Sequence, residues 1–169
     1  MGARKLTPEL SVAAQIVASD IDAIRAAGFR AIICNRPDGE GADQPNFDEI
    51  DQAAKRVGLE TRYLPAESGK VSDEEGEKFG ALMQELPKPV LAYCRTRTRS
   101  TTMWALSQAR NRPMPEIVET AKSAGYDLGA LVRRIANGGK TPVEVADDHD
   151  IVIIGAGAAW DCSSKPAGT

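Results

Sequence analysis

A cysteine followed by alternating arginines is the part of the sequence best suited to chemistry. The stretch VLAYCRTRTRSTT places Cys94 at the end of an apolar run, followed by Arg95, Arg97 and Arg99 at alternate positions. A thiol attacks as its thiolate, and nearby guanidinium groups favour that charged form. The pattern therefore predicts a nucleophile that needs no histidine base, and His149 is the chain's only histidine.

The same stretch is expected to cradle an anion. Backbone N–H groups of residues 95–100 can form a nest at the start of a helix, and one guanidinium can hold two oxygens. Arg99, nearest the expected helix start, is the predicted anion clamp. Its predicted partners in substrate binding are Arg95, Thr96, Arg97, Thr98 and Ser100. The plainer alternative for Cys94 is a buried strand cysteine beside a solvated basic face. Cys34 has the same strand context without the basic loop, and a purely structural cysteine is the expectation there.

Carboxylates near this stretch are candidates for proton transfer. Glu67 in LPAESGKVSD is the predicted acid, and an ordinary solvated loop carboxylate is the open alternative for it. Asp73 follows the expected N-cap Ser72, where a negative charge interacts favourably with the helix dipole. Asp38 and Arg36 of the NRPDGE turn are also placed at the substrate site. Local turn geometry explains Asp38 equally well, and Arg36 could pair with it.

Alternating strands and helices are expected to position these residues. Short apolar runs predict strands at 29–35, 59–65 and 88–94, and apolar spacing with capping signals predicts helices at 19–27, 47–57, 100–109, 115–124 and 128–135. A further helix is expected after the Ser72/Glu75 capping box. The predicted fold is α/β, with a parallel or mixed central sheet flanked by helices on both faces.

Composition narrows the class of protein. A net charge of −3 over 169 residues gives no reason to expect nucleic-acid or membrane binding, so the arginines should meet a small local anion. No apolar run approaches about 20 residues, and we expect a cytoplasmic protein. Three scattered cysteines without matching histidines predict neither a disulfide framework nor a metal site.

The composition changes near the C-terminus. Residues 1–136 are the expected domain, and the Gly-rich, then acidic residues 137–150 are typical of a linker. Residues 151–169 resemble the start of a dinucleotide-binding strand and turn, with Trp160 in place of the third glycine; an unrelated apolar strand is the open alternative. Too little chain follows to complete such a site, so this piece alone is expected to bind no flavin or nicotinamide.

The motifs YCRTRTRS, LPAESGKVSDEEGEKF and IICNRPDGE together resemble the phosphatase-like domain of beta-lactamase-hydrolase-like proteins, which has the tyrosine-phosphatase superfamily fold. The resemblance covers residues 4–135 and implies Cys94 as nucleophile and Arg99 as anion clamp. Some family members are fused to a flavoprotein oxidoreductase. The resemblance thus implies a flavoprotein domain in cis, with FAD belonging to that missing domain and no cofactor expected for residues 1–136.

One position departs from the family loop. Family loops usually read Cys-Arg-Thr/Ser-Gly-Thr-Arg-Ser, whereas this chain has Arg97 at the glycine position. A non-glycine residue at positive φ costs on the order of 1 kcal/mol or more. Reduced activity, or an inactive anion-binding domain, is therefore one expectation.

Two reactions fit an active loop. Phosphoester hydrolysis through a phosphocysteine is the leading expectation. The alternative is sulfur transfer through a persulfide on the same cysteine. Four residues separate Cys94 from Arg99, the spacing of rhodanese-like sulfurtransferases, whereas tyrosine phosphatases have five.

Overall fold

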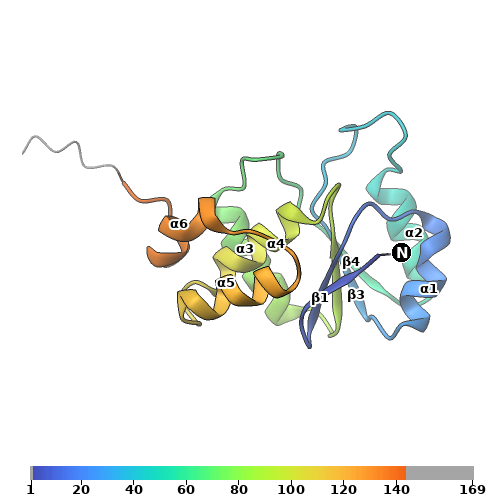
Figure 1. Cartoon of the computed structure of the whole chain (residues 1–169). Coiled ribbons are helices and arrows are strands. Elements are labelled where there is room, and N and C mark those ends of the chain that lie inside the picture. The colour runs from blue at the N-terminus through green and yellow to red at the C-terminus, as the bar shows by residue number, and fades with distance from the viewer. Residues whose placement is uncertain (1, 144–169) are drawn as a thin grey trace, which may run out of the picture.

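A five-stranded mixed sheet forms the centre of the molecule (Figure 1). The computed structural model describes residues 2–143. The strands are β1 (Arg4–Thr7), β2 (Leu10–Ala13), β3 (Ala31–Cys34), β4 (Glu60–Tyr63) and β5 (Val90–Tyr93). Their order in the sheet is β1-β2-β5-β3-β4. Only the β1–β2 pair is antiparallel, while β2, β5, β3 and β4 run parallel to one another.

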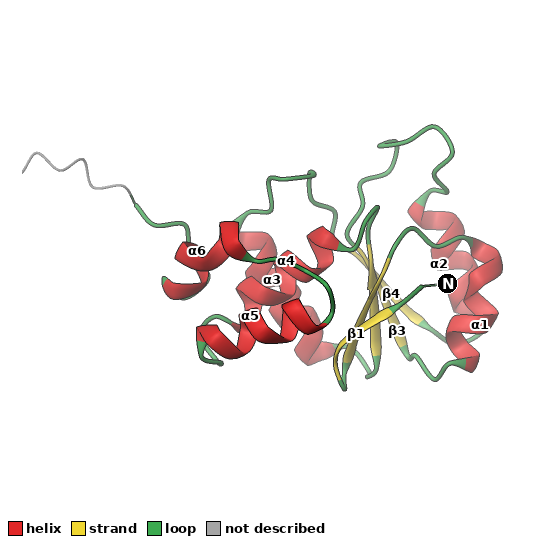
Figure 2. Ribbon diagram, in the orientation of Figure 1, coloured by secondary structure: helices red, strands yellow, loops and turns green. Residues whose placement is uncertain are grey.

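Helices cover both faces of this sheet, as the sequence predicts (Figure 2). One face carries the 3₁₀ turn η1 (Ala18–Asp20), α1 (Ile21–Ala26) and α2 (Phe47–Arg56). The other carries α3 (Asp73–Glu85), α4 (Thr98–Gln108), α5 (Met114–Ser123), the 3₁₀ turn η2 (Gly129–Leu131) and α6 (Val132–Ala136). No helix in the described part of the chain is long and apolar enough to cross a membrane.

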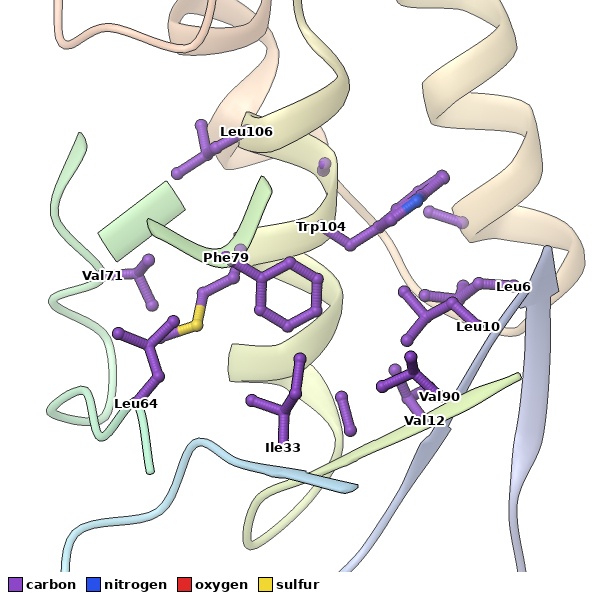
Figure 3. Close-up of a cluster of buried hydrophobic side chains, with 14 of the residues drawn as sticks. Leu6, Leu10, Val12, Ile33, Leu64, Val71, Phe79, Val90, Trp104 and Leu106 are labelled. Carbon is purple, nitrogen blue, oxygen red and sulfur yellow. The ribbon is translucent and has the colours of Figure 1, made fainter. Parts of the chain in front are cut away.

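The alternation of side chains along β5 joins the sheet to both helical layers. Val90 and Ala92 belong to a cluster that includes Phe79 and Trp104 from α3 and α4 (Figure 3). Leu91 and Tyr93 point the other way, into the cluster with residues of α1 and α2. Each large apolar side chain buried in this way contributes about 1.5–3 kcal/mol. Burial on both faces fixes β5, and with it the loop that begins at Cys94.

Most predicted elements are confirmed, including the capping box of α3. The Glu75 N–H donates to Ser72 Oγ at 3.1 Å, and the Ser72 N–H donates to a Glu75 carboxylate oxygen at 2.7 Å. The first two strands were not predicted. They form a short hairpin, and β2 pairs with β5 in register from Leu10 opposite Val90 to Ala13 opposite Tyr93.

The first residues of the predicted linker lie close to α3. Lys140 pairs with Glu77 at 2.5 Å, and the Thr141 N–H donates to Asp73 at 2.8 Å. The first residues of the predicted linker therefore still contact the domain. The boundary at 137 stays a prediction, and the dinucleotide-binding start at 151–169 lies outside the described residues.

Candidate active site

Cys94 lies where β5 ends and the loop to α4 begins. Its side chain is fully buried, and its N–H donates to the Ala13 carbonyl at 3.3 Å. The loop takes three residues, 95–97, to reach the first turn of α4. The positive end of that helix is therefore close in sequence to the cysteine.

Cys34 ends the neighbouring strand and differs from Cys94 in its surroundings. Its Sγ donates to the Arg36 carbonyl at 3.3 Å, and burial raises the pKa of this thiol to about 11. A thiol with that pKa stays protonated near neutral pH. The environment of Cys34 therefore fits the structural role expected of it.

Arg97 takes the left-handed conformation that a glycine would adopt freely. Its φ is 74° and its ψ is −16°, and among the described residues it is the one non-glycine with positive φ. The helix begins there nonetheless, because the Thr101 N–H and Oγ1 both donate to the Arg97 carbonyl at 3.0 Å. The Arg97 side chain turns toward the N-terminus, where Nη1 donates to the Gly2 carbonyl at 2.8 Å.

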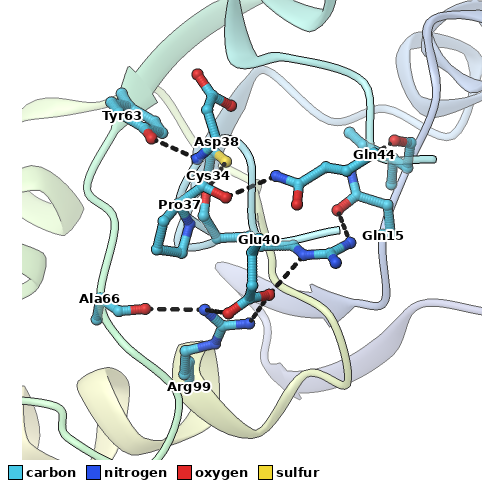
Figure 4. Close-up of polar contacts among 11 residues, drawn as sticks. Gln15, Cys34, Pro37, Asp38, Glu40, Gln44, Tyr63, Ala66 and Arg99 are labelled. Carbon is cyan, nitrogen blue, oxygen red and sulfur yellow. Dashed lines mark hydrogen bonds and ion pairs between the residues drawn. The ribbon is translucent and has the colours of Figure 1, made fainter. Parts of the chain in front are cut away.

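Arg99 is buried and held in one orientation. Its side chain is 5% exposed; Nη1 donates to the Ala66 carbonyl at 2.8 Å and lies 2.8 Å from Glu40 Oε1, while Nη2 donates to Glu40 Oε2 at 2.8 Å (Figure 4). Burial opposes a charged guanidinium, yet the hydrogen bond to Glu40 and the negative charge of a Cys94 thiolate raise the pKa of Arg99 overall. Arg99 and Cys94 therefore lie close enough to interact electrostatically.

These contacts leave one edge of the Arg99 guanidinium unused. Of the five N–H donors of an arginine, Glu40 and Ala66 take both on Nη1 and one on Nη2. The Nε–H and the second Nη2–H donate to no oxygen atom of residues 2–143, and Cys94 is a further side chain that interacts with Arg99. These two donors lie side by side, in the fork that binds two oxygens of a carboxylate or phosphate.

Glu40 is a site residue that the sequence analysis missed. It also accepts from Arg36 Nε at 2.7 Å, and Arg36 in turn donates to Gln15 Oε1 at 2.9 Å. Hydrogen bonds from Arg99 first, and then from Arg36, lower the pKa of Glu40. Arg36 thus pairs with Glu40 rather than with Asp38. No sequence signal distinguishes Glu40 from the other acidic residues of its loop.

Asp38 and Glu67 have other partners. Asp38 Oδ1 accepts the N–H of Phe47, the first residue of α2, at 2.9 Å, so its carboxylate contacts a helix start rather than the Pro-Asp-Gly turn considered for it. Glu67 is 70% exposed and pairs with Lys70 at 2.8 Å, and this hydrogen bond lowers the pKa of Glu67. A lowered pKa makes Glu67 a poorer proton donor at neutral pH, and its role as acid stays a prediction.

A cavity of about 230 Å³ opens beside the loop. Thr96, Thr98 and Arg99 line it, together with Asp127 and Arg134 from the segment that follows α5. Among the remaining residues predicted to bind substrate, Arg95 is exposed, and Ser100 has a buried Oγ with no hydrogen-bond partner in the described chain. Within residues 2–143 no group of three or more His, Cys, Asp or Glu side chains is arranged to hold a metal ion.

The family model "Beta-lactamase hydrolase-like protein, phosphatase-like domain" matches residues 2–111. The chain belongs to this family. The beta-lactamase hydrolase-like protein of Agrobacterium fabrum is 30% identical over 135 residues, which cover 79% of this chain and 31% of that protein. The homologue from Xylella fastidiosa strain Temecula1 is 32% identical over 107 residues, 62% of this chain and 25% of that protein. The chain thus spans about a third or less of these relatives.

Solved structures agree with this assignment. A candidate phosphatase from Neisseria meningitidis superposes with a TM-score of 0.73 at 34% identity, over 82% of this chain and 99% of that one. PTPMT1 superposes with a TM-score of 0.64 at 17% identity, over 82% and 94% of the two chains, and so shows the fold alone. The phosphatase-like domain therefore has the predicted tyrosine-phosphatase-like fold.

Proposed function

We propose that this phosphatase-like domain hydrolyses phosphate monoesters, with Cys94 as nucleophile and Arg99 as the clamp for the phosphoryl oxygens. One observation carries the proposal: the buried guanidinium of Arg99 is fixed by Glu40 and Ala66, so that its unused edge presents two parallel donors. A fixed fork binds a tetrahedral oxyanion without losing side-chain freedom at the moment of binding.

The reaction then proceeds in two steps. The Cys94 thiolate attacks phosphorus, the phosphorus–oxygen bond to the leaving group breaks, and the leaving oxygen takes a proton from a carboxylic acid. Water attacks the phosphocysteine, loses a proton to the same carboxylate, and releases phosphate and the thiolate. Arg99 and the N–H groups of residues 95–98 stabilise the equatorial oxygens in both steps.

Sulfur transfer has less support. The spacing of four residues between Cys94 and Arg99 favours sulfur transfer. The family model is described as phosphatase-like and the Neisseria meningitidis structure as a phosphatase, and neither supports sulfur transfer. The hypothesis that Arg97 leaves only an anion-binding domain predicts phosphate binding without turnover.

Release of phosphate from p-nitrophenyl phosphate tests the proposal, with the same preparation incubated with thiosulfate and weighed by intact mass spectrometry. We expect turnover that Cys94→Ser abolishes, while Cys34→Ser, the matched cysteine control, retains it. Arg99→Lys keeps the charge but loses the fork, and should reduce kcat/KM by about 10²–10³-fold. A sulfur adduct on Cys94 without phosphate release would contradict the proposal, and binding of phosphate without turnover in both wild type and Arg97→Gly would support the inactive domain.

A further inference from the structure

Asp127 lies in the wall of the cavity beside the catalytic loop, and we infer that it is the carboxylate that exchanges protons with substrate and water. Among the described residues that line this cavity, it is the one carboxylate, and it shares the cavity with Thr96, Thr98 and Arg99. The inference rests on the proposed function, because a proton donor is needed only if Cys94 displaces an oxygen leaving group. The family match ends at residue 111, so Asp127 lies outside it.

The other carboxylates near the loop are occupied. Glu40 binds two arginines, and Asp38 accepts an N–H at the start of α2. Asp73 accepts hydrogen bonds from Arg134 and from Thr141. Glu67 pairs with Lys70, and it is absent from the cavity wall although its neighbours Ser68 and Gly69 contribute to it. Asp127 is exposed as well, so the two carboxylates differ in cavity lining rather than in exposure.

Asp127 is held in place by its own loop. Oδ1 accepts the Gly129 N–H at 2.8 Å, while Oδ2 has no hydrogen-bond partner among residues 2–143. The next residue, Leu128, is 3% exposed and fixes the loop to the core, and the Tyr126 N–H donates to the Ala121 carbonyl at 2.9 Å. One oxygen therefore orients the carboxyl group, and the other is free to carry the proton.

In the first step, protonated Asp127 gives its proton to the leaving oxygen as the phosphorus–oxygen bond breaks and the bond from phosphorus to the Cys94 sulfur forms. In the second step, the Asp127 carboxylate takes a proton from the water whose oxygen attacks phosphorus, and the phosphorus–sulfur bond breaks. The thiolate and the protonated acid are thereby restored.

Dependence on the leaving group separates a proton donor from a residue that only supports the loop. Phenyl phosphate needs a proton on its leaving oxygen far more than p-nitrophenyl phosphate does. Asp127→Asn preserves an oxygen acceptor for the Gly129 N–H, so the loop should keep its form. We expect this variant to lose about 10²-fold or more of kcat on phenyl phosphate and less than about tenfold on p-nitrophenyl phosphate.

Glu74→Gln, at an exposed carboxylate that does not line the cavity, is the matched control, and it should leave both rates near wild type. Asp127→Glu, which keeps an acid, should recover part of the loss on phenyl phosphate. Equal losses on both substrates in Asp127→Asn, or a leaving-group dependence that appears in Glu67→Gln instead, would overturn the inference while leaving the proposed function intact. Absence of Cys94-dependent turnover on either substrate in wild type would refute the proposed function, and this inference with it.

Discussion

Replacement of Arg97 by glycine should stabilise the fold, the reverse of what glycine does in the interior of a helix. Arg97 has φ 74° and ψ −16°, in the left-handed region where a side chain's Cβ crowds the backbone. That conformation costs a non-glycine residue about 1–2 kcal/mol. Glycine avoids this cost, but the substitution also removes the hydrogen bond from Arg97 to the Gly2 carbonyl.

The net effect follows from the two contributions. A hydrogen bond near the surface contributes about 0.5–1 kcal/mol to stability, so Arg97→Gly should raise the free energy of unfolding by about 0–1.5 kcal/mol overall. Arg97→Ala is the matched control, because it removes the same hydrogen bond and keeps the Cβ. The free energy of unfolding of Arg97→Gly should therefore be higher than that of Arg97→Ala by about 1–2 kcal/mol, which corresponds to a difference in Tm of roughly 2–8 °C for a chain of this size.

Urea unfolding followed by far-UV circular dichroism measures both variants against wild type. In the middle of an ordinary helix alanine is more stable than glycine by about 1 kcal/mol. If Arg97→Ala is as stable to urea as Arg97→Gly, or more stable, the backbone strain inferred at residue 97 is refuted. If the strain also distorts the anion cradle, Arg97→Gly should raise kcat/KM on p-nitrophenyl phosphate as well.

Other predictions concern the charges and the packing around the site. Glu40→Gln should destabilise the domain by about 1–3 kcal/mol at pH 7, because it removes the charge partner of two buried arginines, whereas Glu74→Gln, at an exposed ion pair, should cause no measurable change. Folding lowers the pKa of Glu40, so the ionised carboxylate stabilises the fold at pH values above about 4.3, the pKa of an unfolded Glu. This contribution is lost as the pH falls through the lower pKa of the folded state. In urea unfolding, Glu40→Gln should therefore lose less stability on acidification than wild type. Gly76→Ala should cost about 1–3 kcal/mol in the same assay, because the added Cβ would lie 2.8 Å from Leu106 Cβ between α3 and α4.

The sequence predicts the fold where local signals are strong. The capping box at Ser72 and the apolar run that ends at Cys94 mark a helix start and a buried strand, and both are confirmed. The first hairpin was missed because β1 and β2 have four residues each and are defined by their pairing across the sheet. Pairing with a strand that is distant in the sequence gives little signal in four consecutive residues.

Some features of the candidate site were also predictable from the sequence, and others were not. The family pattern has a glycine at position 97, and a positive φ is one of the two uses of such a glycine, beside close approach to a ligand; Arg97 adopts the positive φ. The partners of Arg99 could not be predicted, because Glu40 lies in a long loop and Ala66 contributes only its carbonyl. Asp127 reaches the cavity from a segment 28 residues beyond Arg99, and sequence spacing carries no information on that contact.

The central claim is that Cys94 forms a covalent bond to phosphorus while Arg99 holds the phosphoryl oxygens. The most direct test mixes the protein with p-nitrophenyl phosphate, quenches with acid within the first turnover, and locates any phosphoryl adduct by peptide mass spectrometry. The account predicts one phosphoryl group on Cys94, none on Cys34, and a much smaller yield in Arg99→Lys. Turnover with no adduct on Cys94, or with an adduct that forms equally well in Arg99→Lys, would contradict it.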